Sequence, residues 1–338
     1  MDHQLALITG VSGFVAKHIA LRFLQAGWAV RGTLRSPDRA EEVRTALAPH
    51  LTDKALSRLS FAVADLTSDH GWAEAAKGAQ ALIHTASPFP ISQPKDPAAL
   101  VRPAVEGTVR ALRAAHAAGI RRAVVTSSTV AVINENRHGV QDETDWCDLR
   151  AAGTSAYAMS KTLAEKAAWE FVGQEAPDMH LTCINPGLVL GPPLDRHFGS
   201  SISIVQRLLR GRDPMLPMIG FVCVDVRDVA EMHLRAVLQP ETSGKRYLAA
   251  AGTMTMPDMG QVLKQAYPDR RIPTRTAPLL LLRALALFDP AVRSILPSVG
   301  QVHQVDNTRA LREMGMRFIE PADALRASAD WLLSHHAV

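Results

Sequence analysis

A short glycine-rich turn constrains this chain more than any other segment. Gly10 and Gly13 follow a strand-like run at residues 5–9 and directly precede residues 14–26, which have a helical pattern closed by Gly27. Glycine lets backbone approach a ligand closely, and a helix N-terminus presents free N–H groups and partial positive charge. A tight turn alone would explain a glycine pair. Its position after the first strand favours a pyrophosphate site, although the spacing is G-x-x-G-x-x-A rather than G-x-G-x-x-G.

Strand-like and helix-like runs alternate through the first half of the chain. Strands are expected at residues 5–9, 28–33, 59–64, 81–85, 123–126 and 181–185, and helices at 14–26, 37–47, 97–118 and 155–173. Short apolar runs joined by crossover helices favour a parallel sheet covered on both faces. The expected fold class is therefore α/β, with a doubly wound parallel (Rossmann) sheet.

The pattern changes after Asn185. Prolines and glycines crowd residues 186–193, and the regular alternation is lost. We expect residues 1–185 to form the dinucleotide-binding domain and residues 186–338 a smaller substrate lobe, interleaved with elements that return to the first domain. Such a lobe would cover the carboxyl ends of the strands, where open α/β sheets bind ligands. The most apolar run, residues 278–288, is too short to span a bilayer and is expected to be a helix packed on its own domain.

The composition is that of an ordinary globular protein and excludes several partners. The chain has 37 basic and 33 acidic residues, and this small surplus is dispersed, so no nucleic acid is expected. Three cysteines without CxxC spacing indicate neither disulfides nor zinc. His84, His180, His197 and His233 have no ligand spacing beside a carboxylate, so no metal is expected and these histidines are interpreted as surface or capping residues. The absence of a basic leader favours a cytoplasmic protein without membrane contact. We expect a small-molecule partner and a monomer or homodimer.

The end of the second strand indicates which dinucleotide is bound. About twenty residues beyond the glycine turn, where an NAD site usually has a carboxylate, the chain has Arg35 and no acidic residue. An arginine pairs well with a 2′-phosphate, so NADP(H) is favoured over NAD, with Arg31 or Arg39 as reinforcement. A solvated basic surface is the simpler alternative. Asp65 and Leu66, after the third strand, would then face the adenine, with an ordinary helix cap as the alternative.

Tyr157 and Lys161 place a phenol and an ammonium one turn apart on the predicted helix 155–173. A free tyrosine has a pKa near 10, and an ammonium about 4 Å away supplies the roughly 4 kcal/mol that would bring it to about 7. We therefore expect Lys161 to lower the pKa of Tyr157. Upstream, Ser127 and Ser128 end the fifth strand, where a hydroxyl can donate to an oxygen that gains negative charge. Ser128 is favoured over Ser127, and simple capping is the alternative.

These elements, in this order, resemble the extended short-chain dehydrogenase/reductase family. Within it the chain is most similar to the branch of dihydroflavonol 4-reductases, cinnamoyl-CoA reductases and yeast-type aldehyde/ketone reductases. The resemblance is carried by VRGTLRSP at 30–37, HTASP at 84–88, PAVEGT at 103–108, YAMSKTLAE at 157–165, NPGLVLGP at 185–192 and DVRDVA at 225–230. Ala16 stands where the family more often has a third glycine. The long segment that plant enzymes carry before the tyrosine is absent, which disfavours a flavonoid or coenzyme A thioester substrate.

The resemblance implies an NADP-dependent oxidoreductase that reduces an aldehyde or ketone to an alcohol. Tyr157 would be the proton donor, Lys161 its activator and a ribose ligand, and Ser128 the anchor of the carbonyl oxygen. Pro186 and Val189 would line the nicotinamide. The full set expected around the cofactor is Gly10, Ser12, Gly13, Phe14, Val15, Arg35, Asp65, Leu66, Thr85, Ala86, Ser87, Thr126, Tyr157, Lys161, Pro186, Gly187 and Val189.

The substrate side is expected to be apolar, which predicts aryl or medium-chain aldehydes and ketones. Its candidate residues are Phe89, Thr129, Leu188, Met215, Leu216, Ile219 and Phe221. Plain core packing is the alternative for each of them. Two other functions stay open. A nucleotide-sugar epimerase or dehydratase usually carries Asn where this chain has Leu188, and a non-catalytic NADP-sensing regulator typically lacks the tyrosine or the lysine.

Overall fold

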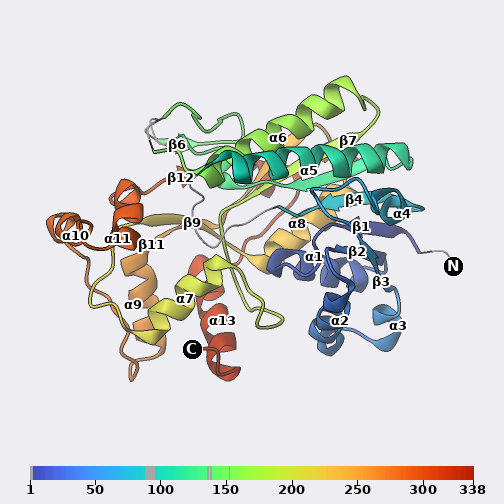
Figure 1. The fold of residues 1–338 in the computed structure, drawn as a ribbon. Helices are drawn as coiled ribbons and strands as arrows, with labels where there is room; N and C mark the ends of the chain where they lie inside the picture. The colour runs from blue at the N-terminus through green and yellow to red at the C-terminus, as the bar shows by residue number, and fades with distance from the viewer. Residues whose placement is uncertain (1–2, 88–95, 135–136, 138, 152) are drawn as a thin grey trace.

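The computed structural model describes residues 3–87, 96–134, 137, 139–151 and 153–338. Seven parallel strands form its largest sheet, in the order β10-β7-β5-β4-β1-β2-β3 (Figure 1). Their bounds are β1 Leu5–Ile8, β2 Ala29–Leu34, β3 Leu59–Val63, β4 Ala81–His84, β5 Arg122–Thr126, β7 His180–Pro186 and β10 Lys245–Ala249. The sheet grows outward from β1 in both directions, so the predicted doubly wound α/β fold is confirmed.

Helices cover both faces of this sheet (Figure 1). One face carries α1 (Phe14–Gln25), α2 (Ala40–Leu47) and α8 (Val226–Leu238), and the other carries α4 (Trp72–Ala76), α5 (Ala98–Ala117) and α6 (Ala156–Gln174). Side chains of a strand point alternately to the two faces. Accordingly, Ala6 and Ile8 pack in the core beneath α1, whereas Leu7 packs in the core beneath α5. A strand buried on both faces needs apolar residues at consecutive positions, which is why β1 is uninterrupted LALI.

The six strands predicted from the sequence are present within one residue of their expected ends. The predicted helix 37–47 begins with a 3-10 turn, Pro37–Arg39, before α2. The sequence does not predict β10, because this strand starts with Lys245 and Arg246. Short elements complete the chain: α3 (Asp53–Leu56), α12 (Thr308–Glu313), and the parallel pair β6 (Val140–Gln141) and β12 (Gln304–Val305).

The C-terminal half forms a lobe around a second, three-stranded sheet. Its strands are β8 (Leu188–Leu190), β9 (Gly220–Asp225) and β11 (Gly252–Thr255), with β9 in the centre. Helices α7 (Ser200–Arg210), α9 (Met256–Ala266) and α13 (Pro321–Ser334) pack around a shared core. Elements beyond residue 185 also lie with the large sheet: α8 packs on α1, β10 pairs with β7, and Ala310 of α12 belongs to the same core.

The apolar run 278–288 does not pack as expected. It forms α10 (Leu279–Leu285), next to α11 (Pro290–Ile295), at one end of the lobe (Figure 1). Leu282 is buried, but Leu280 and Phe288 are 78% and 86% exposed. The prediction of a helix packed on its own domain is therefore wrong for most of these side chains. A short helix at the surface buries only the side chains on one of its faces. Within the described part of the chain, no helix has the length and apolarity needed to cross a membrane.

Candidate active site

A cavity of about 760 Å³ opens at the carboxyl ends of β1, β4, β5 and β7. The glycine turn, the strand ends and the start of α6 form one side of it, and lobe segments form the other. Its lining includes thirteen of the predicted cofactor and catalytic residues: Gly10, Gly13, Phe14, Val15, Thr85, Ser87, Thr126, Ser128, Tyr157, Lys161, Pro186, Gly187 and Val189. Five other predicted residues lie outside the lining: Ser12, Arg35, Asp65, Leu66 and Ala86.

The glycine turn is shaped by two positions that admit no side chain. Gly10 has a φ of +63°, and a Cβ there would lie 3.0 Å from the Cβ of Ala86. Gly32 in β2 lets the turn approach, because a Cβ there would lie 2.3 Å from Val11. Gly13 is the N-cap of α1 and supplies no capping side chain. The turn therefore brings backbone and a helix N-terminus to the cavity, which is the arrangement that binds phosphate groups.

Thr9 joins the ends of β1 and β4. Its hydroxyl accepts hydrogen bonds from the backbone N–H groups of Thr85 and Ala86, each at 3.0 Å, and lies 3.0 Å from Nδ1 of His84. Burial lowers the pKa of His84 to about 3, and the charge of Lys161 adds to this, so the imidazole is neutral. Thr9 thus fixes the backbone of Thr85 and Ala86, two residues predicted to contact the cofactor. The sequence signal for it is a hydroxyl at the end of a buried strand.

Two histidines expected at the surface or in caps are core residues. His84 is 2% exposed and His233 is fully buried. Burial lowers the pKa of His233 to about 4. Its Nδ1 lies 2.7 Å from the carbonyl of Val229, and its Nε2 lies 2.8 Å from the hydroxyl of Thr126. A neutral ring that donates from Nδ1 to Val229 accepts at Nε2 from the hydroxyl of Thr126. His233 thereby orients the side chain of Thr126, which lines the cavity.

Arg35 lies at the end of β2 and is exposed. Asp65 accepts hydrogen bonds from the backbone and hydroxyl of Thr67, which hold its pKa below the usual value, with the charge of Arg35 as a smaller cause. The Asp65 carboxylate thus accepts hydrogen bonds within a local turn. Arg31 donates to backbone carbonyls at the end of α4, and Arg39 pairs with a glutamate on α2, so both proposed reinforcements are engaged elsewhere.

Tyr157 and Ser128 meet in the cavity. Ser155 caps α6 by accepting a hydrogen bond from the N–H of Ala158 at 3.1 Å, which starts the helix just before Tyr157. The side chains of Ser128 and Tyr157 are hydrogen bonded. The Ser128 hydroxyl also donates to the carbonyl of Pro186 at 3.3 Å. Ser127 turns its hydroxyl the other way, to the buried carboxylate of Glu165 at 2.5 Å.

Lys161 does not act on Tyr157 as the sequence predicts. Burial raises the pKa of Tyr157 above its ordinary value, and the hydrogen bond with Ser128 offsets only part of this. The ammonium of Lys161 donates to the carbonyl of Thr126 at 3.1 Å. Burial lowers the pKa of Lys161 to about 8, and the charge of Glu165 opposes that shift. The predicted lowering of the phenol pKa is wrong here, because desolvation of the phenol dominates the shift and Lys161 is not among its causes.

The substrate side contains part of the predicted apolar cover. Thr129, Leu188, Ile219 and Phe221 line the cavity. Leu216 is 1% exposed and belongs to the lobe core, and neither it nor Met215 lines the cavity. Phe89 lies outside the described residues. The sequence misses Ile133, Cys147, Asp148, Ser200, Ser201, Ser294, Ser298, Gln301 and His303, which share no motif and converge only through tertiary packing.

The charge inside the cavity is low. Among its described lining residues, Lys161 is the only lysine or arginine and Asp148 the only carboxylate. The wall formed by α11 and the following segment presents uncharged polar groups, Ser294, Ser298 and Gln301. Such a wall suits neutral hydrogen-bonding substrates better than anions.

One cluster outside the cavity has the side chains of a metal site. Glu42, Asp195 and His197 bring ligand atoms within 4.8 Å of one another. The ammonium of Lys17, which is 1% exposed, pairs with both carboxylates. Buried Lys17, together with Arg39 on Glu42, therefore supplies positive charge to this cluster.

Residues 6–250 match the model of the NAD dependent epimerase/dehydratase family. The chain is 36% identical over 279 residues to cinnamoyl-CoA reductase 1 of Petunia hybrida, covering 80% of each chain. It is 32% identical over 304 residues to ketoreductase azaE of Aspergillus niger, covering 84% of this chain and 89% of that one. The structure is similar to yeast methylglyoxal/isovaleraldehyde reductase Gre2 complexed with NADPH, with a TM-score of 0.82, 26% identity and 99% of both chains covered.

Proposed function

Because the chain belongs to the NAD dependent epimerase/dehydratase family, in its branch of cinnamoyl-CoA and aldehyde reductases, we propose that it reduces an aldehyde or ketone to an alcohol at the expense of NADPH. The observation that carries this proposal is the convergence of Ser128, Tyr157 and Lys161 in one cavity beside the glycine turn. The chain is an oxidoreductase, and NADP(H) is its cofactor.

The residues present fit a dinucleotide. Gly10 and Gly13 leave room at a helix N-terminus for a pyrophosphate, where any side chain at Gly10 would meet Ala86. Arg35, at the end of β2, is the residue we assign to the 2′-phosphate. Pro186, at the end of β7, and Val189, in β8, line the same cavity and would contact the nicotinamide. When bound, NADPH supplies the hydride.

The protein supplies the proton and the hydrogen bonds. The carbonyl carbon gains hydride, the electron pair of its double bond moves to oxygen, and that oxygen takes the proton of Tyr157. Ser128, already hydrogen bonded to Tyr157, donates to the same oxygen as its negative charge develops. A phenol with a raised pKa is fully protonated at neutral pH, which is the form that reduction requires. Lys161 holds a positive charge at the buried base of the site.

The substrate we propose is a neutral aryl or medium-chain aldehyde or ketone. Leu188, Ile219 and Phe221 offer an apolar wall, and Ser298 and Gln301 offer uncharged hydrogen-bonding groups farther out. A carboxylate or phosphate placed there would be desolvated, and the part of the lining that the structure describes contains no arginine to pair with it.

The two alternatives make different predictions. Leu188 lines the cavity two residues after Pro186 and cannot hydrogen bond a sugar nucleotide, which disfavours an epimerase or dehydratase. Tyr157 and Lys161 both face the cavity, which disfavours a non-catalytic regulator.

The test is NADPH oxidation with a panel of uncharged aldehydes and ketones. Turnover that disappears in Tyr157→Phe supports the proposal. NADPH binding without turnover on any carbonyl would favour the regulator, and NAD retained through purification would favour the epimerase.

A further inference from the structure

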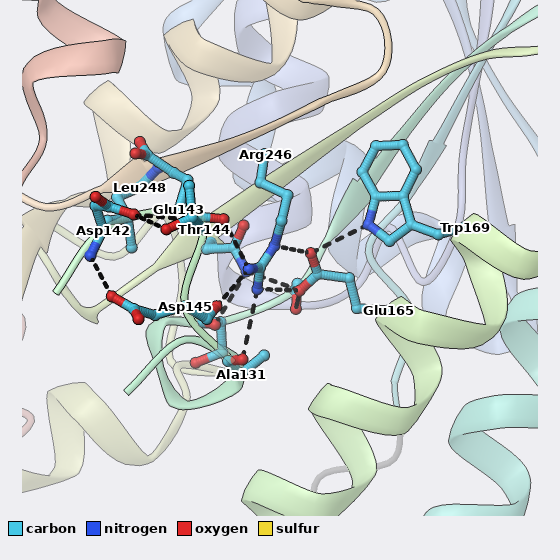
Figure 2. A network of polar contacts seen from close by, with 12 residues as sticks. Ala131, Asp142, Glu143, Thr144, Asp145, Glu165, Trp169, Arg246 and Leu248 are labelled. Atoms are coloured by element: carbon cyan, nitrogen blue, oxygen red, sulfur yellow. Dashed lines mark hydrogen bonds and ion pairs between the residues drawn. The ribbon is translucent and has the colours of Figure 1, made fainter. Parts of the chain in front are cut away.

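Arg246 and Glu165 form an ion pair in the protein interior (Figure 2). Nε of Arg246, on β10, donates to Oε1 of Glu165, on α6, at 2.6 Å, and the two side chains are 8% and 0% exposed. Neither residue lines the cavity, so neither contacts the reactants. Burying two charges carries a large desolvation cost, and a pair this deep needs additional hydrogen bonds to be tolerated. Those additional bonds lead directly to the active site.

Glu165 ties the ends of two strands to the catalytic helix. Its Oε2 accepts from the hydroxyl of Ser127 at 2.5 Å and from the side-chain amide of Asn185 at 2.8 Å. The amide of Asn185 also donates to the carbonyl of Ser128 at 3.2 Å. The Ser128 hydroxyl in turn donates to the carbonyl of Pro186, so β7 holds Ser128 through both its backbone carbonyl and its hydroxyl.

Arg246 ties the same helix to the substrate side. Its guanidinium donates to the backbone carbonyls of Glu143 at 3.0 Å and Asp145 at 2.7 Å (Figure 2). It also lies over the ring of Trp146, with 3.7 Å between the guanidinium carbon and the ring centroid. The two residues that follow Trp146 line the cavity. One planar fork of donors thus supports this wall at Glu143, Asp145 and Trp146.

Glu165 also acts on Lys161, one turn before it on α6. Of the described titratable groups, Glu165 from its own helix and neutral His84 from β4 are coupled electrostatically to Lys161, and Tyr157 lines the same cavity. Because burial lowers the pKa of Lys161 and raises that of Tyr157, Lys161 is the first of the two to lose its proton as pH rises. The carboxylate of Glu165 delays that loss by favouring the ammonium.

We propose that Glu165 and Arg246 are positioning residues with separate tasks. Glu165 holds Ser128, through Ser127 and Asn185, in its place for proton transfer and puts a negative charge one helical turn from Lys161. Arg246 holds the wall at residues 143–148 against the substrate. The kinetic part of this inference rests on the proposed function, whereas its structural part does not.

Glu165→Gln tests the first task. The variant keeps the shape of the side chain and removes its charge, so the pKa of Lys161 falls further below about 8. We expect kcat to fall about tenfold and the alkaline decline of kcat to move to lower pH, since the ammonium is lost earlier. The Kd for NADPH stays within about threefold. In Glu165→Asp, which keeps the negative charge, we expect the alkaline decline of kcat to occur at the same pH as in the wild type.

Arg246→Lys tests the second task. Lysine keeps the charge but cannot reproduce the planar fork. We expect KM for the carbonyl substrate to rise about tenfold, while kcat and its pH profile change by less than about twofold. Hydrogen exchange at residues 139–148 becomes faster, and exchange in β1 and β2 is unchanged.

Two further variants keep the inference falsifiable. Ser127→Ala removes one hydrogen-bond donor to Glu165 and leaves the ion pair with Arg246 intact. If Glu165→Gln fails to fold, Ser127→Ala takes its place in the test. We expect Ser127→Ala to lower kcat and to leave KM unchanged. Glu175→Gln is the matched control, because Glu175 pairs with Arg113 at the exposed end of the same helix. It should match the wild type.

The outcomes separate the two claims. If Glu165→Gln and Arg246→Lys only lower the melting temperature, with pH profile, KM and exchange unchanged, the pair is structural and the inference is overturned. If the wild type reduces no carbonyl, the proposed function fails, and the exchange comparison still decides whether Arg246 holds the wall.

Discussion

The two walls of the cavity differ in how their residues are distributed along the chain. The wall that we propose to face the cofactor, called the cofactor-facing wall, is built from short motifs at strand ends, such as the turn at residues 10–13, and the parallel sheet places them at one edge. The wall that we propose to face the substrate, called the substrate-facing wall, takes Ile133, Leu188, Phe221 and Ser298 from four separate segments. Sheet topology fixes the first wall, whereas the packing of the lobe fixes the second.

This difference explains why the two walls can change independently. A motif on a buried strand end cannot move without disturbing the sheet core around Leu7 and Ile8. The lobe wall can change in size and polarity while the proton donor stays in place. The chemistry is therefore expected to belong to the first wall and the choice of substrate to the second.

The largest expected effect places the chemistry on the cofactor-facing wall. Tyr157→Phe removes the proton donor and should lower kcat by about 10² or more, with the Kd for NADPH nearly unchanged. Tyr267→Phe is the matched control, because that phenol bonds Asp330 in the lobe, away from the cavity. Equal losses in both variants, or a loss of NADPH affinity with turnover intact, would remove Tyr157 from its role.

A smaller effect tests the outer end of the same wall. Arg35→Ala should weaken the binding of NADPH by about ten- to a hundredfold, which is the contribution of a charge-assisted hydrogen bond, and leave the binding of NADH almost unchanged. Arg39→Ala is the comparison, since Arg39 already pairs with Glu42 and should matter less. Fluorescence titration with both dinucleotides gives the result. Equal weakening of NADPH and NADH would contradict the assignment of Arg35 to the 2′-phosphate.

The substrate wall is tested by charge. Benzaldehyde should have kcat/KM at least about tenfold higher than 4-formylbenzoate, because none of the described lining residues is an arginine that could pair with a carboxylate. The methyl ester of 4-formylbenzoate has similar size and no charge, and it should behave like benzaldehyde. If ester and acid are reduced equally well, the proposed preference for neutral substrates is wrong.

The same contrast sets what the sequence can predict. Periodicity and the glycine turn are local signals, and they give six strands of the large sheet and most of the cofactor-facing wall. The sequence also places Tyr157, Lys161 and Ser128 on the right elements. It misses β10, because Arg246 is a strand residue only through a buried pair with a glutamate 81 positions away in the chain. It also gives the wrong direction for the pKa of Tyr157, because desolvation depends on neighbours that spacing does not reveal.

The smallest expected effect concerns the junction between the two regions. Asp228 lies in the first turn of α8, which packs on the large sheet. Its carboxylate accepts a hydrogen bond at 2.8 Å from the N–H of Ile319, just before α13 of the lobe. Burial raises the pKa of Asp228 from 3.8 to about 6, and the bond from Ile319 offsets part of that rise. A raised pKa means that the folded state binds the proton more tightly than the unfolded chain. Stability from this group is therefore complete below about pH 4 and is lost as the pH rises through about 6.

Asp228→Asn should keep the hydrogen bond and remove the ionisation. At pH 7 we expect about 1 kcal/mol of added stability after solvent screening, or roughly 2 °C in melting temperature, and no gain near pH 4. Thermal unfolding at both pH values checks this, with the acidic sample as the internal control. An equal shift at both pH values would mean that Asn acts through packing alone. A gain confined to neutral pH would show that joining the lobe to the sheet leaves a partly desolvated charge at the junction.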